Sequence, residues 1–193
     1  MTEPATDLPT ASPSRVVPFP GTVAAADAPV LLVGNPNVGK SVLFKNLTGR
    51  YVMVSNFPGT TVEIARARGT LGGRAVDVVD TPGVNDLTPS SDEAQVTRRL
   101  LARHAGATVV QVADAKNLRR ALLLTLQLAE LGHPMVLVLN MLDELTARGG
   151  HIDVDALSAL LGIPVVPAVA IRGLGTPEIA AAVAEAARPR LPS

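Results

Sequence analysis

The sequence contains no cysteine and has few aromatic residues: one tyrosine, three phenylalanines and no tryptophan. The lack of cysteine excludes disulfide bonds, thiolate metal sites and cysteine nucleophiles, and it fits an intracellular protein. With so few aromatic side chains, a core has to be built from Val, Leu, Ile and Ala, which is usual for a buried parallel sheet. No apolar run in the sequence approaches the ~20 residues that span a bilayer, so we expect no transmembrane segment.

Neither sign of charge is in excess. Seventeen Lys and Arg residues balance seventeen Asp and Glu, and the basic residues are scattered, so the sequence predicts no nucleic-acid partner. The length of 193 residues suits one domain, which we expect over 28–188. Residues 1–27 are rich in proline and lack the basic start and apolar stretch of a signal peptide. We therefore expect a disordered tail there, and a short C-terminal tail over 189–193.

The segment that follows the apolar run 30–33 has the Gly-x4-Gly-Lys-Ser spacing of a phosphate-binding loop. Its glycines let the backbone turn so that amide N–H groups and a helix N-terminus face an anion. Lys40 would reach the β- and γ-phosphates of a nucleotide, and the Ser41 hydroxyl would bind the accompanying Mg²⁺. The predicted nucleotide-binding residues of this segment are Gly34, Asn35, Pro36, Asn37, Val38, Gly39, Lys40, Ser41 and Val42.

A second polar motif, Asp80-Thr81-Pro82-Gly83, follows the strand expected over 74–79. The carboxylate of Asp80 would hold Mg²⁺, and the amide of Gly83 would contact the γ-phosphate. Taken alone, these residues are also typical of a β-turn with proline at its second position. The phosphate-binding loop upstream favours the nucleotide interpretation, and we include all four residues in the predicted site.

Two polar residues, Asn140 and Asp143, follow the buried strand expected over 135–139. A carboxylate at Asp143 can accept from both the N1–H and the exocyclic amine of guanine, so the pattern indicates guanine rather than adenine. The usual motif has Lys where this chain has Met141, which removes a packing contact on the base but leaves the hydrogen bonds. The alternative is structural: an Asn at the end of a strand and an Asp that caps a short helix.

Strands and helices alternate along the sequence, which predicts an α/β fold with helices on both faces of a sheet. We expect a three-layer P-loop NTPase fold whose six-stranded sheet is mostly parallel, with one antiparallel strand. Gly72-Gly73 predicts a hairpin turn, and the segment 50–61, which lacks periodicity, is expected to be a loop. Ligands of such sheets bind beyond the carboxyl ends of the strands, where each motif falls. The expected strands are 30–33, 62–71, 74–79, 107–113, 135–139 and 165–170.

In their order and spacing, these motifs resemble those of the GTPase domain of the FeoB ferrous-iron transporters. The resemblance covers roughly residues 30–179 and is carried by the segments GNPNVGKS, VSNFPGTTVE, DTPGVNDLTPSSDE, VADAKNLRRALLLTLQLAELGHP and LNMLDE. It implies a cytoplasmic, Mg²⁺-dependent GTPase that converts GTP and water to GDP and phosphate.

The resemblance also implies roles for residues outside the generic motifs. Thr61 would complete the coordination of Mg²⁺ and sense the γ-phosphate. Asn37 would help bind an activating K⁺, together with backbone carbonyls of the loop from Ser55 to Phe57. For Asn37 a purely structural role in shaping the loop is the alternative. The catalytic residues implied in this way are Lys40, Thr61, Asn37 and Gly83.

Two positions bear on how far these roles apply. The residue after Gly83 is Val84, which cannot orient a water molecule as a glutamine does, so a cation has to act where charge develops. Where relatives carry a Ser-Ala pair in the last base-contacting loop, this chain has Val169-Ala170. Only the backbone N–H of Ala170 is then expected to reach guanine O6.

For partners, the resemblance implies GTP, GDP and a membrane transporter domain or subunit for ferrous iron, met at the cytosolic face of the inner membrane. The family continues into helical and membrane domains, whereas this sequence ends at Ser193; a fragment and a separately encoded GTPase both stay open. Two other functions stay open as well. One is a GTP-dependent conformational switch with incidental hydrolysis. The other is a stand-alone GTPase of ribosome or RNA assembly, which the balanced charge disfavours.

Overall fold

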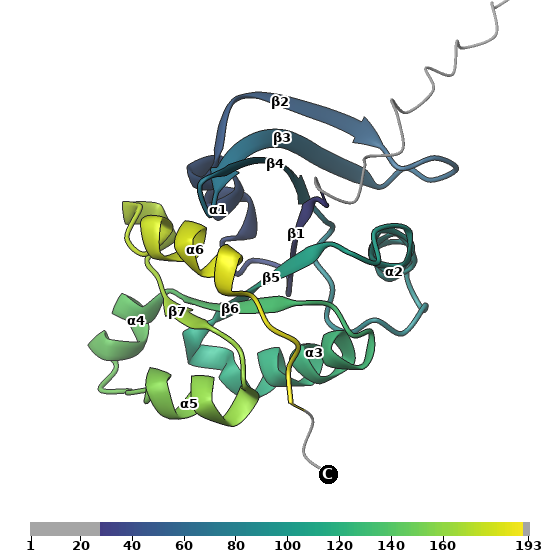
Figure 1. Ribbon diagram of the computed structural model, residues 1–193. Helices are drawn as coiled ribbons and strands as arrows, with labels where there is room; N and C mark the ends of the chain where they lie inside the picture. The colour runs from purple at the N-terminus through teal and green to yellow at the C-terminus, as the bar shows by residue number, and fades with distance from the viewer. Residues whose placement is uncertain (1–27, 191–193) are drawn as a thin grey trace, which may run out of the picture.

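The computed structural model describes residues 28–190, which form one sheet of seven strands with helices on both faces (Figure 1). The strands are β1 (Val30–Gly34), β2 (Thr48–Asn56), β3 (Glu63–Leu71), β4 (Arg74–Asp80), β5 (Thr108–Asp114), β6 (Met135–Asn140) and β7 (Val165–Pro167). The α-helices are α1 (Lys40–Leu47), α2 (Asp92–Arg103), α3 (Leu118–Glu130), α4 (Leu142–Ala147), α5 (Val154–Leu161) and α6 (Thr176–Ala182). Short 3₁₀ turns are η2 (Ala115–Asn117), η3 (Ala170–Arg172) and η4 (Val183–Glu185). The tail expected over 1–27 lies outside the described residues.

The strand order across the sheet is β2-β3-β4-β1-β5-β6-β7. Of these seven strands, β3 alone runs antiparallel to its neighbours β2 and β4, and the other pairs are parallel. This arrangement confirms the predicted α/β fold and its single antiparallel strand.

The sheet has one strand more than the six expected, because Thr48–Asn56 forms the edge strand β2. The prediction of a loop over 50–61 was therefore wrong for the first part of that segment. A half-buried strand is recognised by its alternation of apolar and polar residues. Strand β2 pairs only with β3, and the consecutive residues Val52, Met53 and Val54 are all exposed, so neither face imposes such a period.

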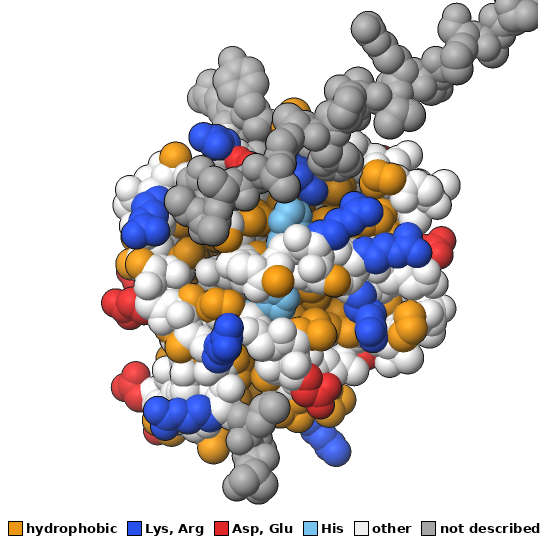
Figure 2. Space-filling view, turned by 45° about the vertical axis from the view of Figure 1, so that its right-hand side comes forward, with side chains coloured by type: hydrophobic (Ala, Val, Ile, Leu, Met, Phe, Trp, Pro, Cys, Tyr) orange, Lys and Arg blue, Asp and Glu red, His pale blue; other side chains and the backbone are white. Residues whose placement is uncertain are grey.

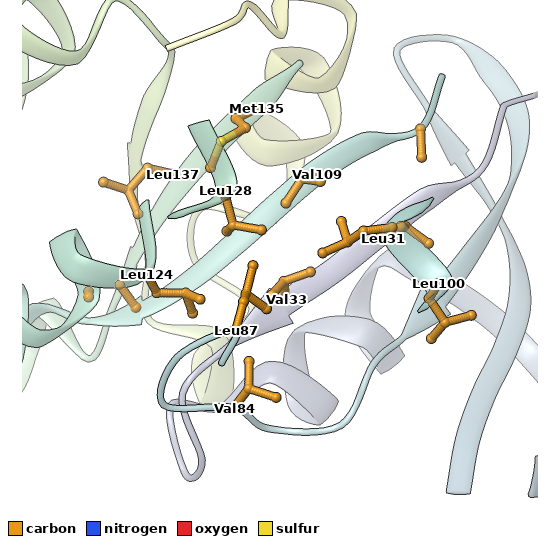
Figure 3. Packing of buried hydrophobic residues seen from close by; sticks show 14 of the residues in the cluster. Leu31, Val33, Val84, Leu87, Leu100, Val109, Leu124, Leu128, Met135 and Leu137 are labelled. Carbon is orange, nitrogen blue, oxygen red and sulfur yellow. The ribbon is translucent and has the colours of Figure 1, made fainter. Parts of the chain in front are cut away.

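Strand β1 lies inside the sheet and is buried on both faces. Leu31 and Val33 point into one hydrophobic cluster, and Val30 and Leu32 point into another. All four are at most 2% exposed, and their alternation follows from the two-residue period of a strand. Residues of α2, α3 and α5 close the first cluster, part of which is shown in Figure 3, and residues of α1 and α6 close the second.

The turn between β3 and β4 confirms the predicted hairpin. Gly72 and Gly73 have φ values of 58° and 73°, and two successive residues in this left-handed region are what a type I′ turn requires. The N–H of Gly72 donates to the carbonyl of Ala180 at 2.7 Å, which ties the hairpin to α6.

The carboxyl ends of β1, β4, β5 and β6 meet at one edge of the sheet, because these strands are parallel. The residues at or near these ends include Gly34, Asp80, Asp114 and Asn140. This edge therefore gathers the motifs that the sequence places far apart.

The surface carries charges of both signs, in line with the equal counts of basic and acidic residues. In Figure 2, Lys and Arg side chains are distributed over the visible face, and acidic side chains lie at several places around its rim. Within residues 28–190, none of the helices has both the length and the apolar character needed to cross a bilayer.

Candidate nucleotide-binding site

The loop between β1 and α1 turns tightly and leaves the N-terminus of α1 open. Asn37 has a φ of 63° and Gly39 a φ of 83°, both left-handed, and α1 begins directly afterwards at Lys40. A side chain at Gly39 would collide with the opposite wall, since a Cβ there would lie 2.3 Å from Nδ2 of Asn140. No side chain caps the first turn of α1, and that turn carries no acidic residue. Its amide groups are therefore available to an anion.

A cavity of about 380 Å³ lies against this loop. It brings the P-loop and the motif that follows β4 to one place, as the sequence predicted. Gly34 and Val38 are buried and belong to the framework of the loop rather than to the lining of the cavity. The residues that line the cavity are Asn35, Pro36, Asn37, Gly39, Lys40, Ser41, Val42 and Gly83.

Two of the predicted side chains, those of Lys40 and Ser41, donate hydrogen bonds to the carboxylate of a third, Asp80. Nζ of Lys40 donates to Oδ1 of Asp80 and to the carbonyl of Thr81, and Oγ of Ser41 donates to Oδ2 of Asp80 at 2.8 Å. Lys40 and Asp80 are each 8% exposed, so the ion pair is largely shielded from water. A hydroxyl and a carboxylate oxygen side by side are ligands of the kind that Mg²⁺ prefers. The donor set at Ser41 and Asp80 thus fits the predicted metal.

The segment after Asp80 is clamped to the P-loop by hydrogen bonds. Nδ2 of Asn35 donates to the carbonyl of Val84 at 3.1 Å, and the N–H of Val84 donates to the carbonyl of Gly34 at 2.9 Å. The side chain of Val84 is 3% exposed and packs into the hydrophobic cluster of Figure 3. It therefore points away from the cavity at the P-loop, so position 84 offers that cavity no side chain.

Asn140 connects the P-loop to the turn at η3. Its Nδ2 donates to the carbonyl of Val38 at 2.8 Å, and its Oδ1 accepts from the N–H of Ala170 at 2.8 Å. The carbonyl of Ala170 in turn accepts from Nδ2 of Asn46 at 2.7 Å. The expectation that the N–H of Ala170 is available to guanine O6 is therefore not met in this structure, because Asn140 already uses that donor. Val169 pairs with Leu174 through its own backbone and is likewise part of the framework.

Asp143 lies in the first turn of α4, where a helix N-terminus favours negative charge. Its side chain is 34% exposed, and Oδ2 is 3.8 Å from Nη2 of Arg172. The short helix of the structural alternative is present, but Met141 precedes it in the left-handed region with a φ of 59°, and no side chain caps it. Asp143 is therefore not the cap of this helix, and its carboxylate stays accessible at the edge of the site.

Lys116 is the residue of this region that the sequence motifs did not indicate. Its Nζ pairs with Oδ1 of Asp114 at 3.1 Å and with Oε2 of Glu144 at 2.8 Å, and it lies 3.4 Å from Sδ of Met141. Although partial burial opposes both charges, their hydrogen bonds raise the pKa of Lys116 and lower the pKa of Asp114. The end of β5, next to the strand that carries Asn140, was the signal that could have pointed to this pair.

The loop after β2 does not complete the site in this structure. The carbonyl of Phe57 accepts from the N–H and from Oγ1 of Thr60, each at 3.0 Å, and the N–H of Phe57 donates to the carbonyl of Val62 at 2.8 Å. Ser55 pairs with Ile64 within the β2–β3 ladder. Ser55, Phe57 and the exposed Thr61 are not among the described residues that line the cavity at the P-loop.

Comparison with known families identifies one model, described as the ferrous iron transport protein B, that matches residues 28–183. A fusion of an Fe(2+) transport protein A and the transporter FeoB from Porphyromonas gingivalis is 42% identical over 151 residues, which are 78% of this chain and 18% of that protein. The Fe(2+) transporter FeoB of Salmonella typhimurium is 43% identical over 148 residues, 75% of this chain and 19% of that protein. The chain thus spans less than a fifth of the length of these relatives.

Solved structures of FeoB domains are similar to this chain in fold as well as in sequence. A mutant of NFeoB from S. thermophilus bound to GDP superposes with a TM-score of 0.78 at 38% identity, over 83% of this chain and 63% of that one. The G domain of the T. maritima FeoB iron transporter superposes with a TM-score of 0.74 at 34% identity, over 82% of this chain and 97% of that one.

Proposed function

The chain belongs to the family of the ferrous iron transport protein B, of which it carries the G domain, and we propose that it hydrolyses GTP to GDP and phosphate. One observation carries the proposal: the open N-terminus of α1, Lys40 and Ser41 lie at a single cavity, and both side chains donate to the carboxylate of Asp80 beside it. Few protein sites combine helix amides, an ammonium, a hydroxyl and a carboxylate in this way except to hold phosphates with a divalent cation.

The residues have separate roles in this proposal. Ser41 and Asp80 would hold Mg²⁺, which neutralises charge on the β- and γ-phosphates when it is bound. The ammonium of Lys40, which pairs with Asp80 in this structure, would turn to the phosphates, and the amide of Gly83 would donate to the γ-phosphate. Because Val84 is buried, its side chain would not orient the attacking water, and Thr61 would complete the coordination of Mg²⁺ and sense the γ-phosphate.

Potassium stimulation is proposed on Asn37, which lines the cavity. The carbonyl of Phe57 does not fit this role in the present arrangement, because Thr60 occupies it, and Ser55 is held in the β-ladder. A complete potassium site would therefore require the segment 55–61 to rearrange.

We propose guanine as the base, read by the carboxylate of Asp143. Since the N–H of Ala170 is bound to Asn140, the following amide, that of Ile171, is our candidate donor to guanine O6. Ile171 lies in η3, and the residue as a whole is 84% exposed.

A second function, that of a conformational switch, is favoured by the loop after β2. It is closed on itself through Phe57 and Thr60 and stays apart from the cavity. Contact between Thr61 and a γ-phosphate would have to open it, and this change could be read by a partner. The relatives of this chain are named Fe(2+) transporters. We therefore propose that its partner is a membrane transporter domain or subunit for ferrous iron, which it contacts at the cytosolic face of the membrane.

Binding of GTP, GDP and ATP in the presence of Mg²⁺ tests the proposal, for example with fluorescent analogues and competition by the unlabelled nucleotides. We expect GTP and GDP to bind and ATP to compete at least about 100-fold more weakly, because adenine leaves the carboxylate of Asp143 without donors. Equal competition by ATP would contradict guanine recognition, and absence of binding by all three would contradict a nucleotide site altogether.

A further inference from the structure

Lys116 lies against the base-reading motif although it is part of neither the P-loop nor that motif. Its Nζ is 3.4 Å from Sδ of Met141, the position at which the usual guanine motif carries Lys. From there the side chain of Met141 reaches toward the P-loop, since its Cε lies 4.0 Å from the point that a Cβ on Gly39 would occupy. The ammonium of Lys116, which lies in η2, is therefore close to the place where a lysine at position 141 would put its own ammonium.

We propose that Lys116 is a positioning residue of the guanine site: its ammonium replaces the one that Met141 lacks, and its ion pairs hold the turn that presents Asp143. This inference rests on the proposed binding of guanine nucleotides. It assigns a role to a residue outside both the P-loop and the base motif.

The ion pairs of Lys116 connect two elements that flank the base motif. Asp114 ends β5, and Glu144 lies in the first turn of α4, directly after Asp143. The side chains of Lys116 and Asp114 are 13% and 15% exposed, whereas that of Glu144 is 51% exposed. The pair with Asp114 is therefore the better shielded of the two, and the pair with Glu144 extends it to α4.

Charge near the nucleotide gives a second reason for this role. Asp114, Asp143 and Glu144 place three carboxylates around the base motif, and a nucleotide brings further negative charge. Arg172, the cation beside Asp143, is 65% exposed and 3.8 Å away, so water screens it. Lys116 is the shielded cation of this group, and its loss would leave Asp114 and Glu144 uncompensated.

The test measures the affinity of GDP and of GTP for the native chain and for Lys116→Met, which keeps the length and apolar stem of the side chain. We expect both nucleotides to bind about fivefold more weakly, a factor typical of a lost, partly screened ion pair. The factor should be the same for GDP and GTP, because Lys116 acts at the nucleoside end. Lys45→Met, an exposed lysine in the last turn of α1, is the matched control and should bind as the native chain does.

Relocating the charge separates a role at the base from a general structural role. In the double variant Lys116→Met/Met141→Lys, the ammonium comes from position 141, and we expect affinity to return to within about twofold of the native value. Glu144→Gln, at an exposed position, should weaken binding by about twofold even if Lys116→Met folds poorly.

Native affinity in Lys116→Met, or a double variant as weak as the single one, would overturn the proposal for Lys116 while leaving guanine binding in place. A loss for GTP but not for GDP would overturn it as well, since the effect would then lie at the phosphates. A native chain that binds neither nucleotide would overturn the proposed function and this inference with it.

Discussion

Asp80 is the residue on which the phosphate side of the site depends. It accepts hydrogen bonds from Lys40 and Ser41 at once, and a metal ion or a phosphate that enters the cavity has to replace part of this arrangement. Hydrogen bonds that involve charged groups contribute about 1.5–3 kcal/mol each, so the contacts of a ligand have to offset the bonds that it displaces. The side chains that are proposed to bind GTP·Mg²⁺ are thus the ones whose hydrogen bonds hold Asp80.

Asp143 carries the prediction on base specificity. Asp143→Asn should move the preference from GTP toward xanthosine triphosphate by about tenfold or more, because the amide can donate to the 2-oxo group where the carboxylate accepted from the 2-amine of guanine. Competition between the two nucleotides measures the change. Asp155→Asn, an exposed acidic residue in the first turn of α5, is the control. An unaltered preference in Asp143→Asn would show that another group reads the base.

Single residues also show where sequence reasoning ends. The convergence of Lys40, Ser41 and Asp80 was predictable, because a P-loop and a second strand end lie at the same edge of a parallel sheet. The use of the Ala170 N–H by Asn140 was not, since the two residues are thirty positions apart and no pattern encodes their contact. The pair of Lys116 with Glu144 was not predictable either, because the two residues lie on different elements.

Among the elements, β2 and the loop that follows it are the least determined by the rest of the fold. Strand β2 has a neighbour on one side only and exposes Met53 to 71%. Phe57 anchors the loop to the core: the residue is 1% exposed, and the guanidinium of Arg103 lies 4.9 Å from the centroid of its ring. The residues on either side of Phe57 are exposed, and an edge strand followed by an exposed loop is the kind of segment that changes conformation with a ligand.

The potassium prediction belongs to this element. If the segment 55–61 rearranges so that its carbonyls join Asn37 around a cation, GTP hydrolysis should be about tenfold or more faster in potassium chloride than in sodium chloride. Asn37→Ala should remove that difference with only a modest loss of GTP affinity, because the P-loop amides remain. Turnover of both proteins in the two salts is the measurement. A native chain that is indifferent to the cation would contradict the prediction.

Elements buried on both faces were predictable, and elements at the margin were not. Strands β1, β5 and β6 read as apolar runs, because helices cover both sides of them. Strand β7 was expected to extend to Ala170 but ends at Pro167, because Val169 and Ala170 leave the sheet for the turn at η3. Helix α4 has only six residues and no side-chain cap among the described residues, so its sequence signals are limited to the acidic first turn of Asp143 and Glu144.

At the scale of the whole molecule, the described residues form a G domain whose family match ends at residue 183. Its relatives are more than five times as long as the matched segment, which covers 18–19% of them. The proposed role in iron transport therefore depends on a partner or a further domain. The proposed GTPase reaction relies on residues of this domain, since the P-loop, Asp80 and Asp143 all belong to it.

Phosphate release from GTP by the native chain, compared with Lys40→Ala, tests the central claim most directly. With Mg²⁺ and potassium chloride present, we expect the native chain to turn over at or above the intrinsic range of small GTPases, about 10⁻⁴ to 10⁻³ s⁻¹. Lys40→Ala should release phosphate only at the background rate and keep the native circular dichroism spectrum, because Lys40 serves the cavity rather than the core. Equal phosphate release by two equally folded proteins would contradict the assignment of this chain as a GTPase.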